Sequence, residues 1–169
     1  MTSPPRPASP GTPPSLAAPH SSGPPPPPAP ALALPDRIRA FLDRPIVATV
    51  ATTSPDGRPH QAVAWYRLEP DGTILVNSRA PRHWPDNIKR TGHASLAVID
   101  PDDDLSWVGL ACELLEVIDD VEQARDDIVA LAHRYRDGHP SPQSIAEFRS
   151  QQRISFRLRP TRVHDHLED

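Results

Sequence analysis

Beyond Pro35, the apolar residues of this chain follow two different periods, one typical of strands and one typical of helices. Ile46–Thr53 consists largely of β-branched residues and small residues that suit a strand. His60–Leu68 and Thr73–Ser78 have the same character, and a turn containing Pro-Asp-Gly precedes each of them. Short turns of this kind join antiparallel neighbours. The sequence therefore predicts that these three strands form a meander.

Three further segments are predicted to be strands. Ala94–Ile99 is short and apolar, whereas Leu105–Val117 is long and contains Gly109, where we expect the strand to bend. Arg153–Leu158 alternates charged and apolar residues, as a half-exposed strand does, and the pattern continues toward His166. With the meander, this gives about six strands.

Four stretches carry the helical period. They are the segment after Pro35, the segment around Pro85, Val121–Gly138 and Ser141–Ser150. The first of them places apolar residues on one face, so we expect it to plug one end of the fold. About six strands with flanking helices indicate the α+β class, mainly β, and a closed or partly closed barrel.

The first 34 residues differ in composition from the rest. More than half of the 24 prolines lie within the first 35 residues, and the run Pro24–Pro28 favours an extended polyproline II path. The remaining side chains there are too small to bury an area that offsets backbone ordering. We therefore predict a disordered proline-rich arm at residues 1–34 and one folded domain at residues 35–169. A ligand for an aromatic-lined groove is an alternative role for the arm.

Charge and cysteine content narrow the classes of function. The net charge is -4 and the arginines are scattered, which disfavours nucleic-acid binding. No apolar run reaches the roughly 20 residues of a spanning helix, and prolines interrupt every candidate secretory signal. The lone cysteine, Cys112, suits a reducing compartment. We expect a cytoplasmic protein without nucleic-acid or membrane partners, and a homodimer because the single-chain core is modest.

A polar loop interrupts the apolar segments after the third predicted strand. It supplies hydrogen-bonding and cationic side chains in succession: Asn77, Ser78, Arg79 and Arg82. A helix start near Pro85 adds free backbone N–H groups, and this combination suits a phosphate. Trp84 would stack on the anion or enclose it. In the alternative interpretation the arginines only solvate a surface loop and Trp84 fills the barrel.

Other polar and aromatic residues have weaker signals. Trp65, Tyr66 and Trp107 are candidates for interface or cofactor contacts, or they are ordinary core aromatics. His164 and His166 share one face of a strand, but no third ligand stands at a recognisable spacing. We interpret this pair as a terminal polar stretch and predict no metal site.

Several segments resemble the split β-barrel flavin and deazaflavin oxidoreductases, the superfamily of pyridoxamine 5'-phosphate oxidase. They are Asp56–Tyr66, Thr73–Ser78, Arg82–Ile88, Ala94–Pro101 and the tail Arg153–Val163. The resemblance spans Ile38–Leu167 and is closest to the branch of probable coenzyme F420-dependent enzymes. It implies an FMN-binding-like split barrel that dimerises and holds its cofactor at the subunit interface.

The resemblance also implies positions for the cofactor-binding residues. The tricyclic ring would be lined by the second strand, with His60, Gln61, Ala62, Val63 and Trp65, and the ribityl chain and phosphate would be held by Asn77, Ser78, Arg82 and Asn87. Two positions depart from the family pattern. Trp84 stands where many members carry Lys or Arg, so Arg79 could supply the missing charge, and Cys112 stands where glycine is common.

The implied reaction is hydride transfer between coenzyme F420 and an unidentified small-molecule acceptor. An FMN-dependent oxidase or reductase of the pyridoxamine 5'-phosphate oxidase type is one alternative, and a non-catalytic flavin-binding module is another. No residue stands out as a catalytic acid or base. His60 lies near the predicted ring strand, but we expect it to be a solvent-facing strand histidine.

Overall fold

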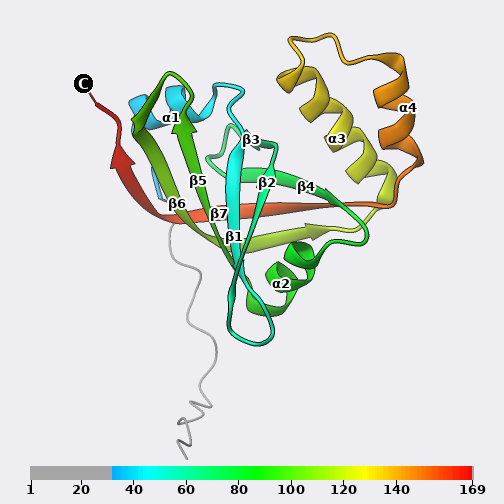
Figure 1. The fold of residues 1–169 in the computed structure, drawn as a ribbon, viewed down its shortest axis with the longest axis horizontal. Helices are drawn as coiled ribbons and strands as arrows, with labels where there is room; N and C mark the ends of the chain where they lie inside the picture. Colours follow the sequence, from blue (N-terminus) through cyan, green and yellow to red (C-terminus); the bar gives the residue numbers. More distant parts are fainter. Residues whose placement is uncertain (1–31, 169) are drawn as a thin grey trace, which may run out of the picture.

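The computed structural model describes residues 32–168, so all of the predicted arm except its last three residues lies outside the described part (Figure 1). Four helices are present there: α1 (Asp36–Leu42), α2 (His83–Thr91), α3 (Val121–Tyr135) and α4 (Pro142–Ser150). The strands are β1 (Ala48–Thr53), β2 (Pro59–Ala64), β3 (Tyr66–Leu68), β4 (Ile74–Arg79), β5 (His93–Asp100), β6 (Asp103–Ile118) and β7 (Arg153–His166). The described chain is mainly β, as predicted.

One antiparallel sheet contains all of these strands, in the order β2-β1-β5-β6-β7-β4-β3. Its two edge strands, β2 and β3, follow each other in the sequence and are separated only by Trp65. The sheet must therefore curl until its edges approach each other, which makes a split barrel. The pairings of the predicted meander are confirmed, because β2 pairs with β1 and β3 pairs with β4. The predicted single strand His60–Leu68 is wrong, because the structure divides it at Trp65 into the two edge strands.

The interior of the barrel is apolar, as strand alternation requires. In β1 the side chains of Ala48, Val50 and Thr52 are buried, while those between them are more exposed. Helices close the two ends of the barrel. Ile38 and Leu42 of α1 belong to the core, and so do Trp84 and Ile88 of α2 (Figure 1). The prediction that the helix after Pro35 plugs one end is confirmed.

A tyrosine from α3 joins the seam of the barrel, where the segment that precedes β1 meets the start of β3. Tyr135 donates its hydroxyl proton to the carbonyl oxygen of Ile46 at 2.9 Å, with Tyr66 O at 3.2 Å as a second acceptor. The same hydroxyl accepts from the Tyr66 backbone N–H at 3.2 Å. One side chain thus bonds to backbone groups on both sides of this seam.

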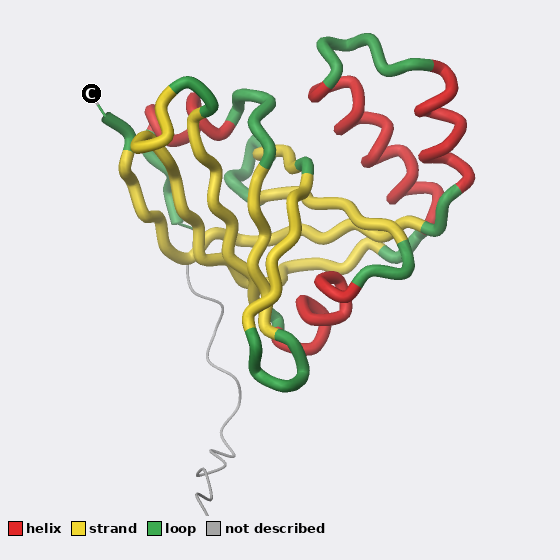
Figure 2. Tube along the Cα trace, in the orientation of Figure 1, coloured by secondary structure: helices red, strands yellow, loops and turns green. Residues whose placement is uncertain are grey.

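Helices α3 and α4 lie next to each other on the outer side of the sheet (Figure 2). Asp120 caps α3 by accepting a hydrogen bond from Gln123 N at 2.8 Å, and Ser141 caps α4 from Ser144 N at 3.1 Å. Ala124 of α3 packs over β4 and is fully buried. This helix pair therefore covers the outer face of β4 and of the beginning of β7.

Strand β6 changes register against β7 twice, between Ala111 and Cys112 and between Leu114 and Glu116. These irregularities lie beyond Gly109, where the bend was predicted. A Cβ at Gly109 would come within 3.0 Å of the Trp107 ring, so the glycine makes room for that indole. None of the helices in residues 32–168 is long and apolar enough to span a bilayer. The predicted cytoplasmic location stays a prediction.

Candidate functional site

The loop between β4 and α2 brings two exposed arginines to the surface. Arg79 ends β4, and Arg82 precedes α2 in an extended conformation with φ -143° and ψ 144°. No side chain caps α2, so the N–H groups of its first turn stay open to a ligand. Pro85 lies in that first turn, as predicted, and it removes one donor from it. The backbone around Arg82 is therefore compatible with an anion.

A cavity of about 360 Å³ lies against this loop. It is lined by Arg79, Ala80, Pro81, Arg82, Pro85, Asp86, Lys89, Asp119, Gln152, Arg153 and Ile154. Four of these residues are cationic and two are carboxylates. The lining is thus net positive in a chain whose net charge is -4. We call this space the cationic cavity.

Arg153 is the buried member of this lining. Its residue is 7% exposed, yet within residues 32–168 no carboxylate forms an ion pair with it. It donates from Nη1 to Asn77 Oδ1 at 3.0 Å and from Nη2 to Gln151 Oε1, while its Nε is buried without a partner. Burial, followed by the charges of Arg82 and Arg79, lowers the pKa of Arg153 to about 10. The guanidinium stays charged at neutral pH and would be stabilised by an anion.

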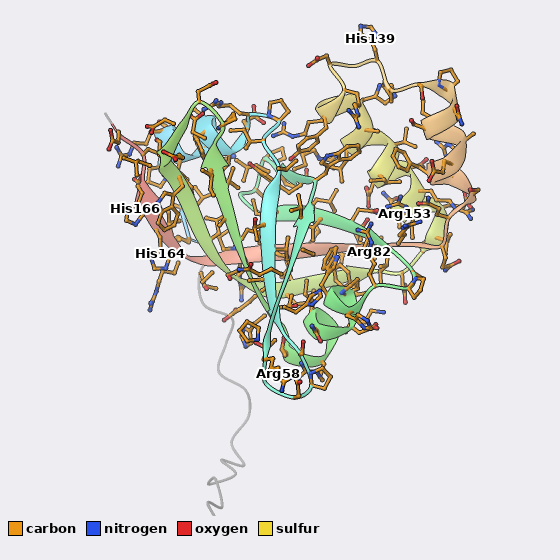
Figure 3. The ribbon with its side chains drawn as sticks, in the orientation of Figure 1. Arg58, Arg82, His139, Arg153, His164 and His166 are labelled. Atoms are coloured by element: carbon orange, nitrogen blue, oxygen red, sulfur yellow. The ribbon has the colours of Figure 1, made fainter. Side chains whose placement is uncertain are left out.

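A second cavity of about 220 Å³ adjoins the first, because Arg82 and Arg153 line both. Its other lining residues are Val63, Ala64, Trp65, Asn77, Ile128 and Phe148. Figure 3 shows Arg82 and Arg153 close together between the sheet and the α3–α4 pair. Phe148 lies on the guanidinium of Arg153, whose Cζ is 5.2 Å from the ring centroid. We call this second space the aromatic cavity.

The structure brings five of the predicted site residues to these two cavities. Val63, Trp65, Asn77 and Arg82 line the aromatic cavity, and Arg79 lines the cationic one. Both side-chain ends of Asn77 are already used: Nδ2 donates to Ala124 O at 2.8 Å and to Ser155 Oγ at 2.9 Å, and Oδ1 accepts from Arg153. Asn77 is thus placed to orient Arg153.

Three predicted residues lie inside the barrel instead. Ser78 is fully buried, and Asn87 is 3% exposed and donates to Thr52 Oγ1 at 3.1 Å. Trp84 is 1% exposed and packs near Phe156, with 6.0 Å between the ring centroids. In this geometry the expected stacking of Trp84 on an anion is wrong, because its indole would have to leave the core to reach either cavity. Trp84 fills the barrel, as the alternative interpretation held.

The remaining predicted residues of β2 point elsewhere. His60 lies against His83, with ring centroids 6.3 Å apart, and Ala62 packs on the core. Gln61 lines a separate hollow of about 270 Å³ on the outer face of β1, β5 and β6. None of these three side chains lines the cationic or the aromatic cavity.

The aromatic candidates also separate. Tyr66 is fully buried and belongs to the core. Trp107 lines neither cavity and stacks on His166 with centroids 4.1 Å apart, and Figure 3 shows His166 far from Arg82 and Arg153. Trp65 stacks on Tyr135 at 5.1 Å and borders the aromatic cavity. Only Trp65 therefore lies where a ligand in these cavities can touch it.

The lining of the aromatic cavity contains neither a carboxylic acid nor a histidine among the described residues. In the same part of the chain, no three His, Cys, Asp or Glu side chains gather in a metal-binding arrangement. What the two cavities offer is an apolar, aromatic compartment joined to a cationic one. This suits a planar ligand with an anionic tail.

Comparison with known proteins identifies the family to which this fold belongs. The family model of pyridoxamine 5'-phosphate oxidase matches residues 34–167, so the chain belongs to this family of flavin-binding split barrels. A search among curated proteins found no match. Among solved structures, the chain is similar to an F420 reductase, with 23% identity and a TM-score of 0.63 over 78% of this chain and 98% of the other.

Two further structures share the fold. A putative pyridoxamine 5'-phosphate oxidase from Listeria innocua has 14% identity and a TM-score of 0.56, covering 77% of this chain and 95% of its own. HutZ, the heme storage protein from Vibrio cholerae, has 18% identity and a TM-score of 0.56, covering 79% and 95%. At such identities the likeness shows the split barrel alone. The family thus defines a flavin-binding type of fold. The structures similar to this chain include a reductase and a heme protein.

Proposed function

We propose that this protein is an oxidoreductase that binds coenzyme F420 and transfers hydride between it and a small-molecule acceptor. The observation that carries the proposal is the meeting of the cationic and aromatic cavities at Arg82 and Arg153. A phosphate-bearing tail and a planar ring need such a pair of compartments. Membership of a flavin-binding family supports the assignment of the ring.

The residues present fit an anionic tail. Arg79, Arg82 and Arg153 line one cavity, and none of them pairs with a carboxylate in the described part of the chain. The buried Nε of Arg153 has a donor proton without an acceptor. Guanidinium groups match phosphate oxygens with two parallel donors, so these three residues would hold the tail. Val63, Trp65 and Phe148 would border the ring.

F420 is favoured over FMN for two reasons. The cationic cavity, at about 360 Å³, exceeds what one terminal phosphate fills, and F420 continues beyond its phosphate into an acidic tail. The likeness to an F420 reductase points the same way. FMN stays the principal alternative, because both cofactors carry a tricyclic ring and a phosphate. A flavin-binding module without catalysis is the other alternative.

When bound, a reduced deazaflavin supplies a hydride and resists one-electron reaction with oxygen. The contribution of this chain is to hold the tail through its arginines and to keep water from the ring through Trp65, Phe148 and Ile128. The acceptor gains one hydride and one proton. We assign the proton to water, because the described lining holds no carboxylic acid or histidine.

We also propose that the protein is a homodimer that completes this site. Val63 borders the aromatic cavity and is 64% exposed, so the chain alone leaves one side of that cavity open. Ile99 and Leu105 are further exposed apolar residues of the sheet. A second copy would cover this surface. Sedimentation velocity checks the mass, and a monomer that binds cofactor with full affinity would contradict the proposal.

The test of function uses the full chain and both cofactors. Titration with F420 and with FMN, followed by quenching of cofactor fluorescence, should give tighter binding of F420. Reduced F420 is then mixed with quinones, enones and tetrapyrroles, and its oxidation is followed by absorbance. Tighter binding of FMN with oxygen consumption would establish the oxidase alternative. Tight binding of either cofactor without turnover of any acceptor would establish the non-catalytic module.

A further inference from the structure

A third cavity of about 270 Å³ lies where α3 passes into α4. It is lined by Trp65, Ala132, Arg136, His139, Pro140, Ser141, Ser144 and Phe148. The hydroxyls of Ser141 and Ser144 lie 2.9 Å apart and bond to each other, which leaves one of their two protons for a ligand. His139 points outward at the tip of the connection (Figure 3). Arg136 is the charged group that remains.

Arg136 differs from its neighbour Arg134. Arg134 donates to the carbonyl oxygens of Leu42 at 3.1 Å and Arg44 at 2.9 Å, so its donors are used by carbonyl groups at the C-terminal end of α1. The guanidinium of Arg136 instead lies over the Trp65 ring, 5.7 Å from the centroid. Within residues 32–168 it makes no hydrogen bond or ion pair. Arg136 is exposed, and its donors are available to a ligand while its guanidinium lies against an aromatic ring.

The third cavity and the aromatic cavity share two walls. Trp65 and Phe148 line both, with ring centroids 6.2 Å apart in an edge-on arrangement. Because these rings separate the two spaces, a group in the third cavity is not in contact with a ring in the aromatic one. A molecule that lies across the edge of Trp65 can still place one end in each cavity. The third cavity therefore suits the distal end of an acceptor.

We propose that Arg136 binds the carboxylate of the acceptor, and that the substrates are unsaturated carboxylic acids with an apolar body. This inference rests on the proposed function, since it places the reacting end of the acceptor beside the aromatic cavity. Ala132, Pro140 and Phe148 give the third cavity its apolar surface, and Arg136 provides the fork that matches two carboxylate oxygens. A remote contact of this kind selects among acceptors without taking part in the chemistry.

Binding is tested first without cofactor. Cinnamate and its methyl ester differ only in the charge, and phenyl phosphate tests whether another oxyanion serves as well. Binding is followed by NMR through the indole N–H resonance of Trp65, assigned with Trp65→Phe. The titration is done in an Arg82→Ala background, so that the arginines of the cationic cavity compete less for the probe. Cinnamate should shift this resonance at concentrations where the ester does not.

Arg136→Met keeps the apolar stem over Trp65 and removes the charge. It should weaken cinnamate binding about 3- to 5-fold, the loss expected for an ion pair at an exposed arginine. The matched control is Arg149→Gln on α4, which removes an arginine that pairs with Asp126 at 2.9 Å and lines none of the three cavities. Equal binding of acid and ester, or an unchanged affinity in Arg136→Met, would overturn the inference. If phenyl phosphate binds more tightly than cinnamate, Arg136 binds a phosphate and not a carboxylate, and the inference is overturned in that part.

Turnover provides the second readout. With reduced F420, Arg136→Met should raise KM for an unsaturated acid about 3- to 5-fold and leave kcat and the F420 dissociation constant nearly unchanged. KM for the ester of the same acid should not change with the substitution. If F420 does not bind at all, the proposed function fails, whereas the cinnamate titration still decides whether Arg136 holds a carboxylate. A fall in kcat for both acid and ester would contradict an anchoring role.

Discussion

Asn77 accepts a hydrogen bond from Arg153, with 3.0 Å between Oδ1 and Nη1, across the paired strands β4 and β7. The amide cannot turn freely, because its Nδ2 is held by Ala124 O and Ser155 Oγ. Its oxygen is therefore fixed toward the guanidinium. Arg153 is kept charged and accessible to two cavities without a carboxylate to neutralise it. The contact prepares an anion site at the cost of a buried, partly unsatisfied cation.

Asn77→Ala should weaken cofactor binding by about 1–2 kcal/mol, because Arg153 loses the group that orients it. Arg153→Gln should weaken it by a similar amount. The double variant should lose less than the two single losses combined, since both act through one contact. Isothermal titration with F420 measures the four affinities, and thermal unfolding confirms that each variant is folded. Simple additivity would mean that Asn77 does not act through Arg153.

Arg82→Ala should weaken cofactor binding by about 1.5–3 kcal/mol, the value of a hydrogen bond to a charged group. The matched control is Arg58→Ala, because Arg58 lies in the turn between β1 and β2, far from both cavities, with a side chain that is 85% exposed (Figure 3). The affinity of the wild type should also fall as salt is raised, and less steeply so in Arg82→Ala. An equal effect of the two substitutions would contradict the cationic cavity as the tail site.

Periodicity predicted most of the elements but not how the barrel closes. In His60–Leu68 the inward positions Ala62, Ala64 and Tyr66 continue one alternation without a break. The division at Trp65 arises because the strand changes its partner there, from β1 to β4. Partner choice depends on the closure of the whole sheet, which a local pattern does not contain. For the same reason, the sequence predicted one long strand, His60–Leu68, where the structure has the two edge strands β2 and β3.

The candidate site was predicted in part. The loop arginines follow from their order in the sequence, whereas Arg153 was missed because its strand alternates like a half-exposed one. It is buried because α3 and α4 cover the beginning of β7, a contact that is remote in sequence. The burial of Trp84, in contrast, could have been predicted from the sequence. Trp84 and Ile88 stand four residues apart in a helix, so both belong to one face, and that face is buried.

Tyr135→Phe should lower the free energy of unfolding by about 1–2 kcal/mol, because it leaves part-buried backbone groups of Ile46 and Tyr66 without this partner. The ring can keep its stacking on Trp65, so the aromatic cavity should persist. Urea unfolding measures the loss, and faster hydrogen exchange of the Tyr66 amide locates it at the seam. Arg149→Gln on the neighbouring helix is the control. Unchanged exchange at Tyr66 would show that the seam does not depend on this hydroxyl.

The stability of the protein should fall in alkali through a thiol that takes no part in binding. Cys112 is 3% exposed on the inner face of β6, and burial raises its pKa to about 12 from an ordinary value of 9.0. Between these two pH values the unfolded chain binds fewer protons than the folded one. The contribution of the thiol to stability is therefore complete below about pH 9 and is lost as the pH rises, by up to about 1.4 kcal/mol per unit.

Cys112→Ala removes this loss, apart from a constant offset for the missing sulfur. Urea unfolding of both proteins at pH 8, 9.5 and 10.5 should give wild-type free energies that fall more steeply than those of the variant. Burial also raises the pKa of Tyr66 and of Tyr135, and both proteins share the destabilisation that follows from those phenols. The difference between the two curves thus isolates the thiol. Parallel curves would mean that Cys112 ionises in the folded protein, and a thiol reagent that labels the native protein at pH 8 would reveal the same exposure directly.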